Sequence, residues 1–359
     1  MITPRTDHDA ALAAAERDAV VVWRGERIPF GDLRRRIAET DSRSEREGLY
    51  ASWIEALEAM HPLHRARHEA RPAGAPPVLD AGELERFTLA SETEYHAALR
   101  RYLAQLGIEQ GDATLADAWH IERGSAWSSW FGPREIERAL TATGRRAEDL
   151  PADGGWRAAR WVMAGTPGTS SGRSAVGELF GWLVGDPTWL ADALRMAPDD
   201  IPAFADFAAF VRLWEVRRSI GIAQYHDRLR ATEDEALQRA YFSGVVGHVT
   251  GLVMPEAAYL WILDAVDAPV PHLERSMLAG AMAEQLESRF GPAWWSVDEA
   301  RGVVDRLAET SEVRDVLAQL GYHAMDWRPL LRQIRTRLIG EMSGYGGPNI
   351  TTRAGTRKV

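Results

Sequence analysis

Residues 156–190 read WRAARWVMAGTPGTSSGRSAVGELFGWLVGDPTWL, and we take this stretch as the one that decides the fold. An arginine-dotted apolar segment leads into a Gly/Ser/Thr loop at 165–172. Ser174 then begins an apolar helix that carries Glu178, and a Gly-Asp-Pro sequence marks its end. A small-residue loop that enters a helix exposes free backbone N–H groups, so it can hold an anion, and Arg173 adds a positive charge. The other interpretation is a plain surface connection.

Composition limits the class of protein. The chain has 359 residues, of which 45% are hydrophobic and 26% charged, as in ordinary soluble proteins. Its net charge of −10 argues against a nucleic-acid partner and against an anionic membrane surface. No apolar run is long enough to span a bilayer, and the first residues lack the basic-then-apolar pattern of a signal peptide. The sequence therefore predicts a cytoplasmic protein.

The residues that are rare in the chain exclude several chemistries. Cysteine is absent, which excludes disulfides, thiol nucleophiles and thiolate metal sites. Lys358 is the only lysine, so a Schiff base with pyridoxal phosphate is not expected. Residues 167–174 (PGTSSGRS) come near the spacing of a phosphate-binding loop, but Pro and Arg replace its first Gly and its Lys. We expect no cofactor, and basic roles fall to arginine and histidine.

Apolar periodicity predicts a mainly α fold with few short strands. Long helical patterns cover 32–70, 200–229 and 327–339, while residues 20–30 read as a short hairpin or an extended link. Capping boxes that begin at Ser91, Thr232 and Ser296 predict further helix starts, and Pro133 another. We divide the chain into N-terminal helices at 1–78, a second helical segment at 79–155, a third helical region at 156–340 and a disordered tail at 341–359.

Two side-chain groups along this path admit two interpretations each. His61, His64 and His68 share one helical face, which could bind a metal but, with no acidic residue at ligand spacing, is read as a solvated face. Trp119, Trp127 and Trp130 form an aromatic group that is read as core, with a substrate-stacking wall as the alternative.

The C-terminal half resembles a known family. TGLVMPEAAYL at 250–260 and FGPAWW at 290–295 are similar to the end of M3-like zinc metallopeptidases, where the patterns are TGxxxPExxYL and FGxxWW. The helix with Glu178, followed by DPTWL at 186–190, resembles the family's third-ligand helix, and residues 213–225 resemble the next one, with its Arg-Arg pair and later Tyr. The resemblance covers roughly residues 160–335. It implies a helical body in two halves around a cleft.

The chain departs from this family at its catalytic motif. It contains no HExxH, which supplies two zinc-binding histidines and a general base. The positional counterpart at 162–166 reads VMAGT, so Glu178 would be a third ligand without the other two, and no zinc is expected. Counting back from FG at 290, the family's Tyr-Leu-Arg becomes His272-Leu273-Glu274. The resemblance thus places a titratable His–Glu pair at the old cleft.

Two functions fit these observations. The first is a repurposed enzyme that binds an amino-acid- or peptide-derived anionic substrate, free or carried by a small protein, for a non-hydrolytic biosynthetic step such as an elimination or cyclisation with loss of phosphate or sulfate. The second is a non-catalytic pseudopeptidase, a peptide-binding or regulatory subunit of a partner protein. Imidazole titrates near pH ~6.5, which suits a base. The candidate catalytic residues are His272, Glu178, Glu274, His248 and Tyr259. The candidate substrate-binding residues are Gly168, Ser170, Ser171, Arg173, Ser174, Arg217 and Tyr225.

Overall fold

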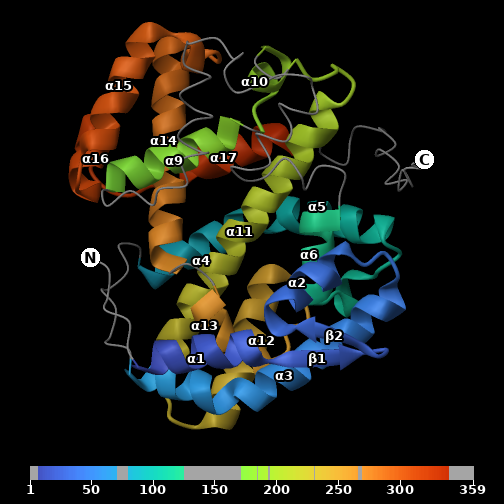
Figure 1. Cartoon of the computed structure of the whole chain (residues 1–359). Coiled ribbons are helices and arrows are strands. Elements are labelled where there is room, and N and C mark those ends of the chain that lie inside the picture. The colour runs from blue at the N-terminus through green and yellow to red at the C-terminus, as the bar shows by residue number, and fades with distance from the viewer. Residues whose placement is uncertain are drawn as a thin grey trace.

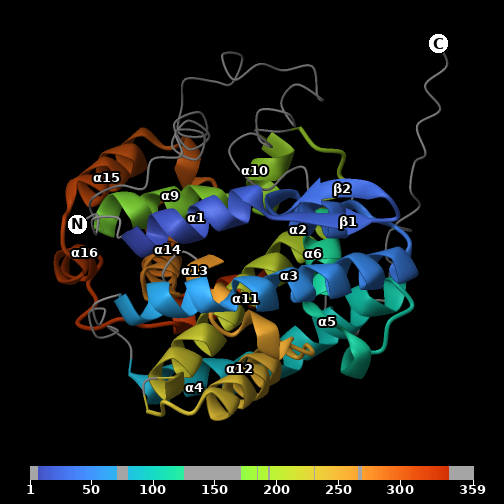
Figure 2. The ribbon, with the colours of Figure 1, turned by 60° about the horizontal axis from the view of Figure 1, so that its bottom comes forward.

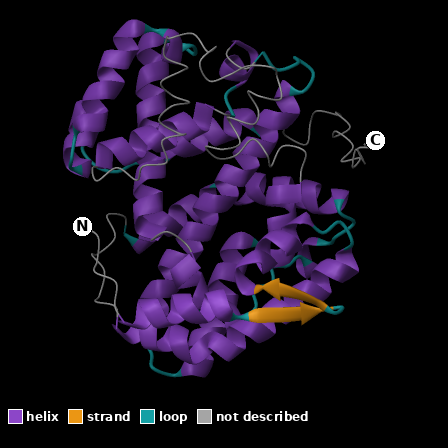
Figure 3. Cartoon of the chain, in the orientation of Figure 1, coloured by secondary structure: helices purple, strands orange, loops and turns teal. Residues whose placement is uncertain are grey.

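The computed structural model describes residues 7–70, 80–124, 171–183, 185–192, 195–229, 231–265 and 269–338. Within these ranges the chain forms fifteen α-helices, three 3-10 helices (η) and one two-stranded sheet (Figure 1). The mainly α prediction is confirmed, and the two strands are a small addition at one side (Figure 3). No helix among the described residues has the length and apolar character that crossing a membrane requires.

The elements are given in chain order, with residues 71–79 and 125–170 outside the described ranges. The N-terminal part contains α1 (Asp7–Asp18), β1 (Val20–Trp23), β2 (Glu26–Pro29), α2 (Phe30–Glu39), α3 (Arg43–Ala70), α4 (Ala81–Ala90), α5 (Glu92–Gln105), η1 (Gln110–Asp112) and α6 (Leu115–Gly124). The C-terminal part contains α9 (Ser171–Leu183), α10 (Pro187–Asp192), α11 (Ile201–Leu229), α12 (Glu235–Thr250), η4 (Glu256–Ala258), α13 (Trp261–Ala265), α14 (Pro269–Phe290), η5 (Trp294–Ser296), α15 (Asp298–Glu309), α16 (Val313–Gln319) and α17 (Arg328–Arg337).

The predicted hairpin is present. β1 and β2 pair antiparallel in the register Val20↔Pro29 to Trp23↔Glu26. Arg24 and Gly25 both have positive φ, 49° and 85°, which is the requirement of a two-residue type I′ turn. The turn is thus made by Arg-Gly between the β-branched and aromatic run VVVW and the strand ERIP.

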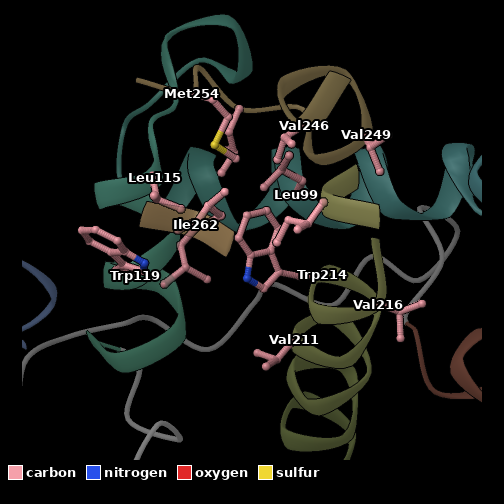
Figure 4. Close-up of a cluster of buried hydrophobic side chains, with 14 of the residues drawn as sticks. Leu99, Leu115, Trp119, Val211, Trp214, Val216, Val246, Val249, Met254 and Ile262 are labelled. Carbon is pink, nitrogen blue, oxygen red and sulfur yellow. The ribbon is translucent and has the colours of Figure 1, made fainter. Parts of the chain in front are cut away.

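Two apolar clusters form the interior. The first joins α2 to α6 with most of α11, α12, η4, α13 and α17, and Figure 4 shows part of it around Trp119 and Trp214. The second joins α9, α10, α14, η5, α15 and α16. Trp119 packs edge-on against Trp53 with ring centroids 5.0 Å apart, so it is a core residue, whereas Trp127 and Trp130 lie outside the described residues. Residues from each of the three predicted helical segments, 1–78, 79–155 and 156–340, contribute to the first cluster, whereas the second contains residues of 156–340.

The long helix α11 connects the two clusters. Phe204 and Ala208 near its start belong to the second cluster, and Phe207 and the residues from Ala209 onward belong to the first. In Figure 1 it runs diagonally between the helices around α14 and α15 and those around α3 and α12. α14 contacts α11, and residues of α14 belong to both clusters (Figure 2). α9, α11 and α14 therefore meet where the two clusters join.

The sequence predicted helix positions better than helix ends. The pattern at 32–70 is two helices, because the chain breaks at Thr40–Ser42. α5 begins after Ser91, but the capping box predicted there is wrong: Ser91 makes no side-chain cap and its hydroxyl donates to the Thr88 carbonyl oxygen. α12 is capped by Asp234 rather than Thr232, and α15 follows Val297 without a side-chain cap. Pro133 and the tail at 341–359 lie outside the described residues.

Candidate functional site

The N-terminus of α9 docks on the C-terminus of α15. The backbone N–H of Ser171 donates to the Ser311 carbonyl oxygen at 3.1 Å, and that of Gly172 donates to the Thr310 carbonyl oxygen at 3.0 Å. The positive end of one helix thus faces the negative end of another, which is favourable for both. These N–H groups are committed to protein carbonyls, so the predicted convergence of Ser171 to Ser174 on an anion is wrong for this end of the loop.

The other members of the predicted anion loop are only partly described. The Arg173 side chain is exposed and Ser174 is partly buried. Gly168 and Ser170 lie outside the described residues, as do Val162 to Thr166, the counterpart of the missing HExxH. The described part of the loop is therefore a helix-to-helix docking point.

Glu178 lies near the middle of α9 and is surrounded by positive charge from two other helices. Its Oε1 is 2.5 Å from Nη1 of Arg212 on α11, and its Oε2 is 3.6 Å from Nε of Arg275 on α14. The Ser276 hydroxyl donates to the same Oε1 at 3.1 Å. The Arg212 guanidinium also lies over the Trp182 ring, 4.4 Å from its centroid. We call Glu178, Arg212, Glu215, Ser219, His272, Arg275 and Ser276 the Glu178 cluster.

The pKa values of two carboxyl groups in this cluster are shifted in opposite directions. Burial alone would raise the pKa of Glu178, but the Arg212 and Arg275 charges and the Ser276 hydrogen bond outweigh it and hold the pKa below its ordinary value. Glu215, one turn after Arg212 on α11, has its Oε2 3.9 Å from the same Nη1. Burial raises the pKa of Glu215 to about 7 against the partial compensation by Arg212. One carboxylate is thus fixed as an anion and the other exchanges a proton near neutral pH.

His272 occupies the first turn of α14 and contacts α11. Its Nδ1 is 2.9 Å from the Ser219 hydroxyl oxygen. Burial lowers the pKa of His272 to about 4, and the nearby Arg275, Arg212 and Arg218 charges act in the same direction against Glu178. The imidazole is therefore neutral at physiological pH. The charge of Glu178 acts on His272, so these two catalytic candidates lie near each other, whereas the pair expected from the sequence was His272 with Glu274; the carboxyl group with a pKa near neutrality is Glu215.

These two shifts act oppositely on stability. Between about pH 4.5 and 7 the folded protein keeps a proton on Glu215 that the unfolded chain has lost, so this group makes the fold less stable as pH rises. Between about pH 4 and 6.5 the folded protein leaves His272 unprotonated while the unfolded chain protonates it, so this group makes the fold more stable as pH rises. The two contributions offset each other where the windows overlap.

The donor set around Glu178 does not fit the zinc ion of the M3-like family. Both carboxylate oxygens of Glu178 face arginine side chains, which would repel a second cation, and His272 Nδ1 is occupied by Ser219. In the part of the chain that the structure describes, no three side chains of His, Asp or Glu gather as metal ligands do. We derive no chemical step through zinc.

The aspartate of the DPTWL sequence has a structural role. Asp186 Oδ1 accepts the backbone N–H of Trp189 at 2.9 Å and so caps α10, whose first residue is Pro187. Its other oxygen lies 3.1 Å from Arg337 Nη2 on α17. This part of the resemblance is thus explained by local capping and does not by itself indicate a metal site.

Arg217 is a structural residue and not a substrate ligand, which corrects the sequence-based assignment. It is 1% exposed, and its Nε donates to the Val249 carbonyl oxygen at 2.8 Å. Its Nη1 donates to the Thr88 carbonyl oxygen and the Ser91 hydroxyl, both at 2.8 Å. The guanidinium thereby joins α11 to α12 and to the junction of α4 and α5.

Tyr259 belongs to a second polar group, apart from Glu178. Its buried hydroxyl is 2.6 Å from His61 Nε2 on α3, and the two rings stack. Arg65 lies 3.5 Å from the same hydroxyl and pairs with Glu235 at 2.6 Å. The solvated-face interpretation is wrong here, because η4 packs on α3 and covers His61, while His64 is 2% exposed.

The remaining candidates are scattered. Tyr225 is fully buried in the first cluster, where no hydrogen-bond partner for its hydroxyl occurs within the described residues. The ring thus packs as a core residue, and no contact of its hydroxyl with a described residue bears on the predicted role in substrate binding. His248 is exposed on α12, where its charge acts on His96. Glu274 is partly buried on α14, two residues after His272.

The sequence interpretation missed Arg212, Glu215, Ser219, Arg275 and Ser276. Arg212, Glu215 and Ser219 recur at i, i+3 and i+7, so they share one face of α11, and this polar stripe within an otherwise apolar helix was the available signal. Nothing in the sequence shows that the charged residues of α9 and α14 pack against that stripe.

No model of a known protein family matches the chain, and no curated protein matches its sequence. The M3-like relationship therefore stays a hypothesis.

Proposed function

We propose that this protein binds an amino-acid- or peptide-derived substrate through a negatively charged group at the Glu178 cluster and performs a non-hydrolytic acid–base step there. The observation that carries the proposal is the arrangement around Arg212. Its guanidinium lies near two carboxyl groups, of which Glu178 has a lowered pKa and Glu215 a raised one. Carboxyl groups whose environments push their pKa values apart are typical of paired acid and base roles.

The charges of the cluster suit an anionic substrate group. Arg212, Arg218 and Arg275 act on His272 from two helices, and Glu178 and Glu215 supply the counter-charge. The Nε atoms of Arg212 and Arg218 are buried and have no hydrogen-bond partner within the described residues. Donors of this kind can bind a carboxylate, phosphate or sulfate oxygen, and arginine does so with two parallel hydrogen bonds.

Glu215 supplies the base in this proposal. In an elimination, ionised Glu215 takes a proton from the carbon next to a carbonyl or carboxyl group, the electron pair forms the new double bond, and phosphate or sulfate leaves with its bonding electrons. Arginine charge stabilises the departing anion. A pKa near 7 suits this role, because a base of that kind is both available and strong enough at neutral pH. An M3-like ancestry would explain why the cluster forms where the family's third ligand lies.

Binding of defined anions tests the proposal. We would measure O-phospho-L-serine, O-sulfo-L-serine, N-acetyl-L-glutamate and inorganic phosphate by isothermal titration calorimetry, with Arg212→Met and Arg275→Met as variants. A charge-assisted hydrogen bond contributes about 1.5–3 kcal/mol, so each variant should bind at least about tenfold more weakly. Arg314→Met is the control, because that side chain is 91% exposed and far outside the cluster. Urea unfolding establishes that each variant is folded. Equal binding by wild type and both variants would refute the site.

The pseudopeptidase function is the second candidate, and one observation favours it. Glu178 is held by two arginines and a serine, and the start of α9 is docked on α15, so the region around the old third ligand is stabilised without a substrate. In the same titrations this function predicts binding of unmodified peptides with an affinity that Glu215→Gln does not change, and no conversion of the phosphorylated or sulfated amino acids.

A further inference from the structure

Like Ser276, Ser219 directs its hydroxyl to another helix, whereas several other helical hydroxyls in the protein bond within their own helix. Ser52, Thr88 and Thr250 each donate to the carbonyl oxygen four residues earlier in their own helix, at 3.1, 3.0 and 2.6 Å. This is the common arrangement for a hydroxyl inside a helix. Ser219 instead lies across the helix interface with its Oγ 2.9 Å from His272 Nδ1. This contact is its only side-chain hydrogen bond to the described residues.

The buried hydroxyl hydrogen has one acceptor available. A neutral imidazole carries its single proton on Nδ1 or on Nε2, and the other nitrogen accepts. If Nδ1 carried it, the ring would donate to Ser219, and the hydroxyl hydrogen of a side chain that is 1% exposed would meet no acceptor among the described residues. If Nε2 carries it, Ser219 donates to Nδ1. Burying an unpaired donor is unfavourable, so the second arrangement is the stable one.

We propose that Ser219 donates to Nδ1 of His272 and holds the neutral ring as the Nε2–H tautomer, so that His272 offers a substrate a hydrogen-bond donor and not a base. The part of this inference that concerns a substrate rests on the proposed function, whereas the tautomer does not. Ser219 is in these terms a positioning residue that acts through His272.

The surroundings of His272 keep the ring neutral, as the tautomer requires. Arg275 on the same helix and Arg212 and Arg218 on α11 disfavour a further positive charge, and Glu178 on α9 is the opposing group. His272 also lies in the first turn of α14, where the helix dipole acts against protonation. His272 is partly exposed while Ser219 is not, so the ring has an edge left for a ligand.

A neutral N–H donor complements the base assigned above. When Glu215 removes a proton next to a carbonyl, negative charge develops on the carbonyl oxygen. A neutral imidazole N–H placed in a low-dielectric site stabilises that oxygen without adding a full charge. The two roles are thus divided between two residues of the cluster.

Nuclear magnetic resonance of ¹⁵N-histidine-labelled protein at pH 7 reads the tautomer directly. Long-range ¹H–¹⁵N correlations distinguish a protonated from an unprotonated ring nitrogen, and His272→Gln identifies the signals. We expect wild type to show Nε2 protonated and Nδ1 unprotonated. In Ser219→Ala a fraction of Nδ1–H rings should appear. Ser276→Ala is the matched control, because that serine, four residues from His272, bonds to Glu178 and should leave the ring pattern unchanged.

A pH titration of the same signals tests the direction of the Ser219–His272 hydrogen bond independently, through the direction in which the pKa of His272 changes. A donor to Nδ1 favours the neutral ring, so its removal in Ser219→Ala should raise the pKa of His272 by about one unit, a tenfold change in proton affinity. If the ring donated to Ser219 instead, the same substitution would lower the pKa. A wild-type spectrum with Nδ1 protonated overturns the inference even if the variant fails to fold. The proposed function fails separately, if the anion titrations show no dependence on Arg212 and Arg275.

Discussion

Replacing Gly172 by alanine tests the docking of α9 on α15. A Cβ at this position would lie 1.9 Å from the Leu307 carbonyl oxygen and 2.7 Å from that of Thr310, whereas real Cβ contacts are not found under 3.0 Å. The start of α9 must then withdraw by about 1 Å, since backbone carbonyls at a helix end cannot rotate aside. That displacement breaks the hydrogen bonds from Ser171 and Gly172, each contributing about 1 kcal/mol.

The expected loss follows from these contributions. Two hydrogen bonds give about 2 kcal/mol, and strain from overpacking gives about 1–3 kcal/mol more. The helix preference of alanine over glycine returns up to about 1 kcal/mol. We therefore expect Gly172→Ala to lower the free energy of unfolding by about 2–4 kcal/mol, measured by urea unfolding followed by tryptophan fluorescence.

Gly181→Ala in the same helix is the matched control. A Cβ there meets no atom within 4 Å, and the position is exposed. It should stabilise the protein by about 0.5–1 kcal/mol through helix preference alone. If Gly172→Ala gave the same change as Gly181→Ala, α9 would not be docked on α15, and the N–H groups of Ser171 and Gly172 would again be available to an anion.

Four further substitutions follow from buried polar groups. Tyr259→Phe should cost about 1–2 kcal/mol, because it leaves a partner of the phenol unpaired, while Tyr225→Phe should be neutral or slightly stabilising; equal effects in urea unfolding would contradict the hydrogen-bond assignment. Arg217→Met should cost at least about 3 kcal/mol, since it strips two carbonyls and a hydroxyl of their donor, and a loss under about 1 kcal/mol would refute its structural role. In wild type, Glu215 lowers the free energy of unfolding by about 2 kcal/mol as pH rises from 4.5 to 7, allowing for the 30% exposure of its side chain, and Glu215→Gln should remove this loss. The free energy of unfolding of the variant should then rise with pH up to about 6.5, because His272 remains. Parallel pH curves for variant and wild type would contradict the raised pKa of Glu215.

Apolar periodicity was sufficient to predict the long helices. The pattern at 200–229 corresponds to α11 at Ile201–Leu229, because an apolar stripe of that length has to face a core. The break between α2 and α3 was not predictable in this way, since the pattern continues through it. The break is stabilised from a distance: the buried Arg46 guanidinium donates to the carbonyl oxygens of Thr40 and Asp41 at 3.1 and 2.8 Å.

The candidate site shows the same limit. Glu178 and His272 were named from sequence, and the structure brings both into one cluster. Their partners were not named, because the sequence does not show which charged residues on a helix are covered by another helix. Such residues are therefore interpreted as solvated. Arg217 shows the converse error: its position in a pair with Arg218 suggested a ligand contact, but its guanidinium is consumed by backbone carbonyls of α12 and α4.

α11 also determines how rigid the Glu178 cluster is. A helix of 29 residues is about 43 Å long, and beyond its second residue it contains no proline that would interrupt its backbone hydrogen bonds. Gly221 on the same helix lies close to the backbone of Val246: a Cβ added at position 221 would be 3.3 Å from the Val246 Cα. The start of α11 is thus held in the second apolar cluster and the rest of the helix in the first. Arg212, Glu215 and Ser219 are carried on successive turns of that helix, so the spacing of their Cα atoms is set by its backbone, and under the proposed function a substrate would be selected by how well it matches that spacing.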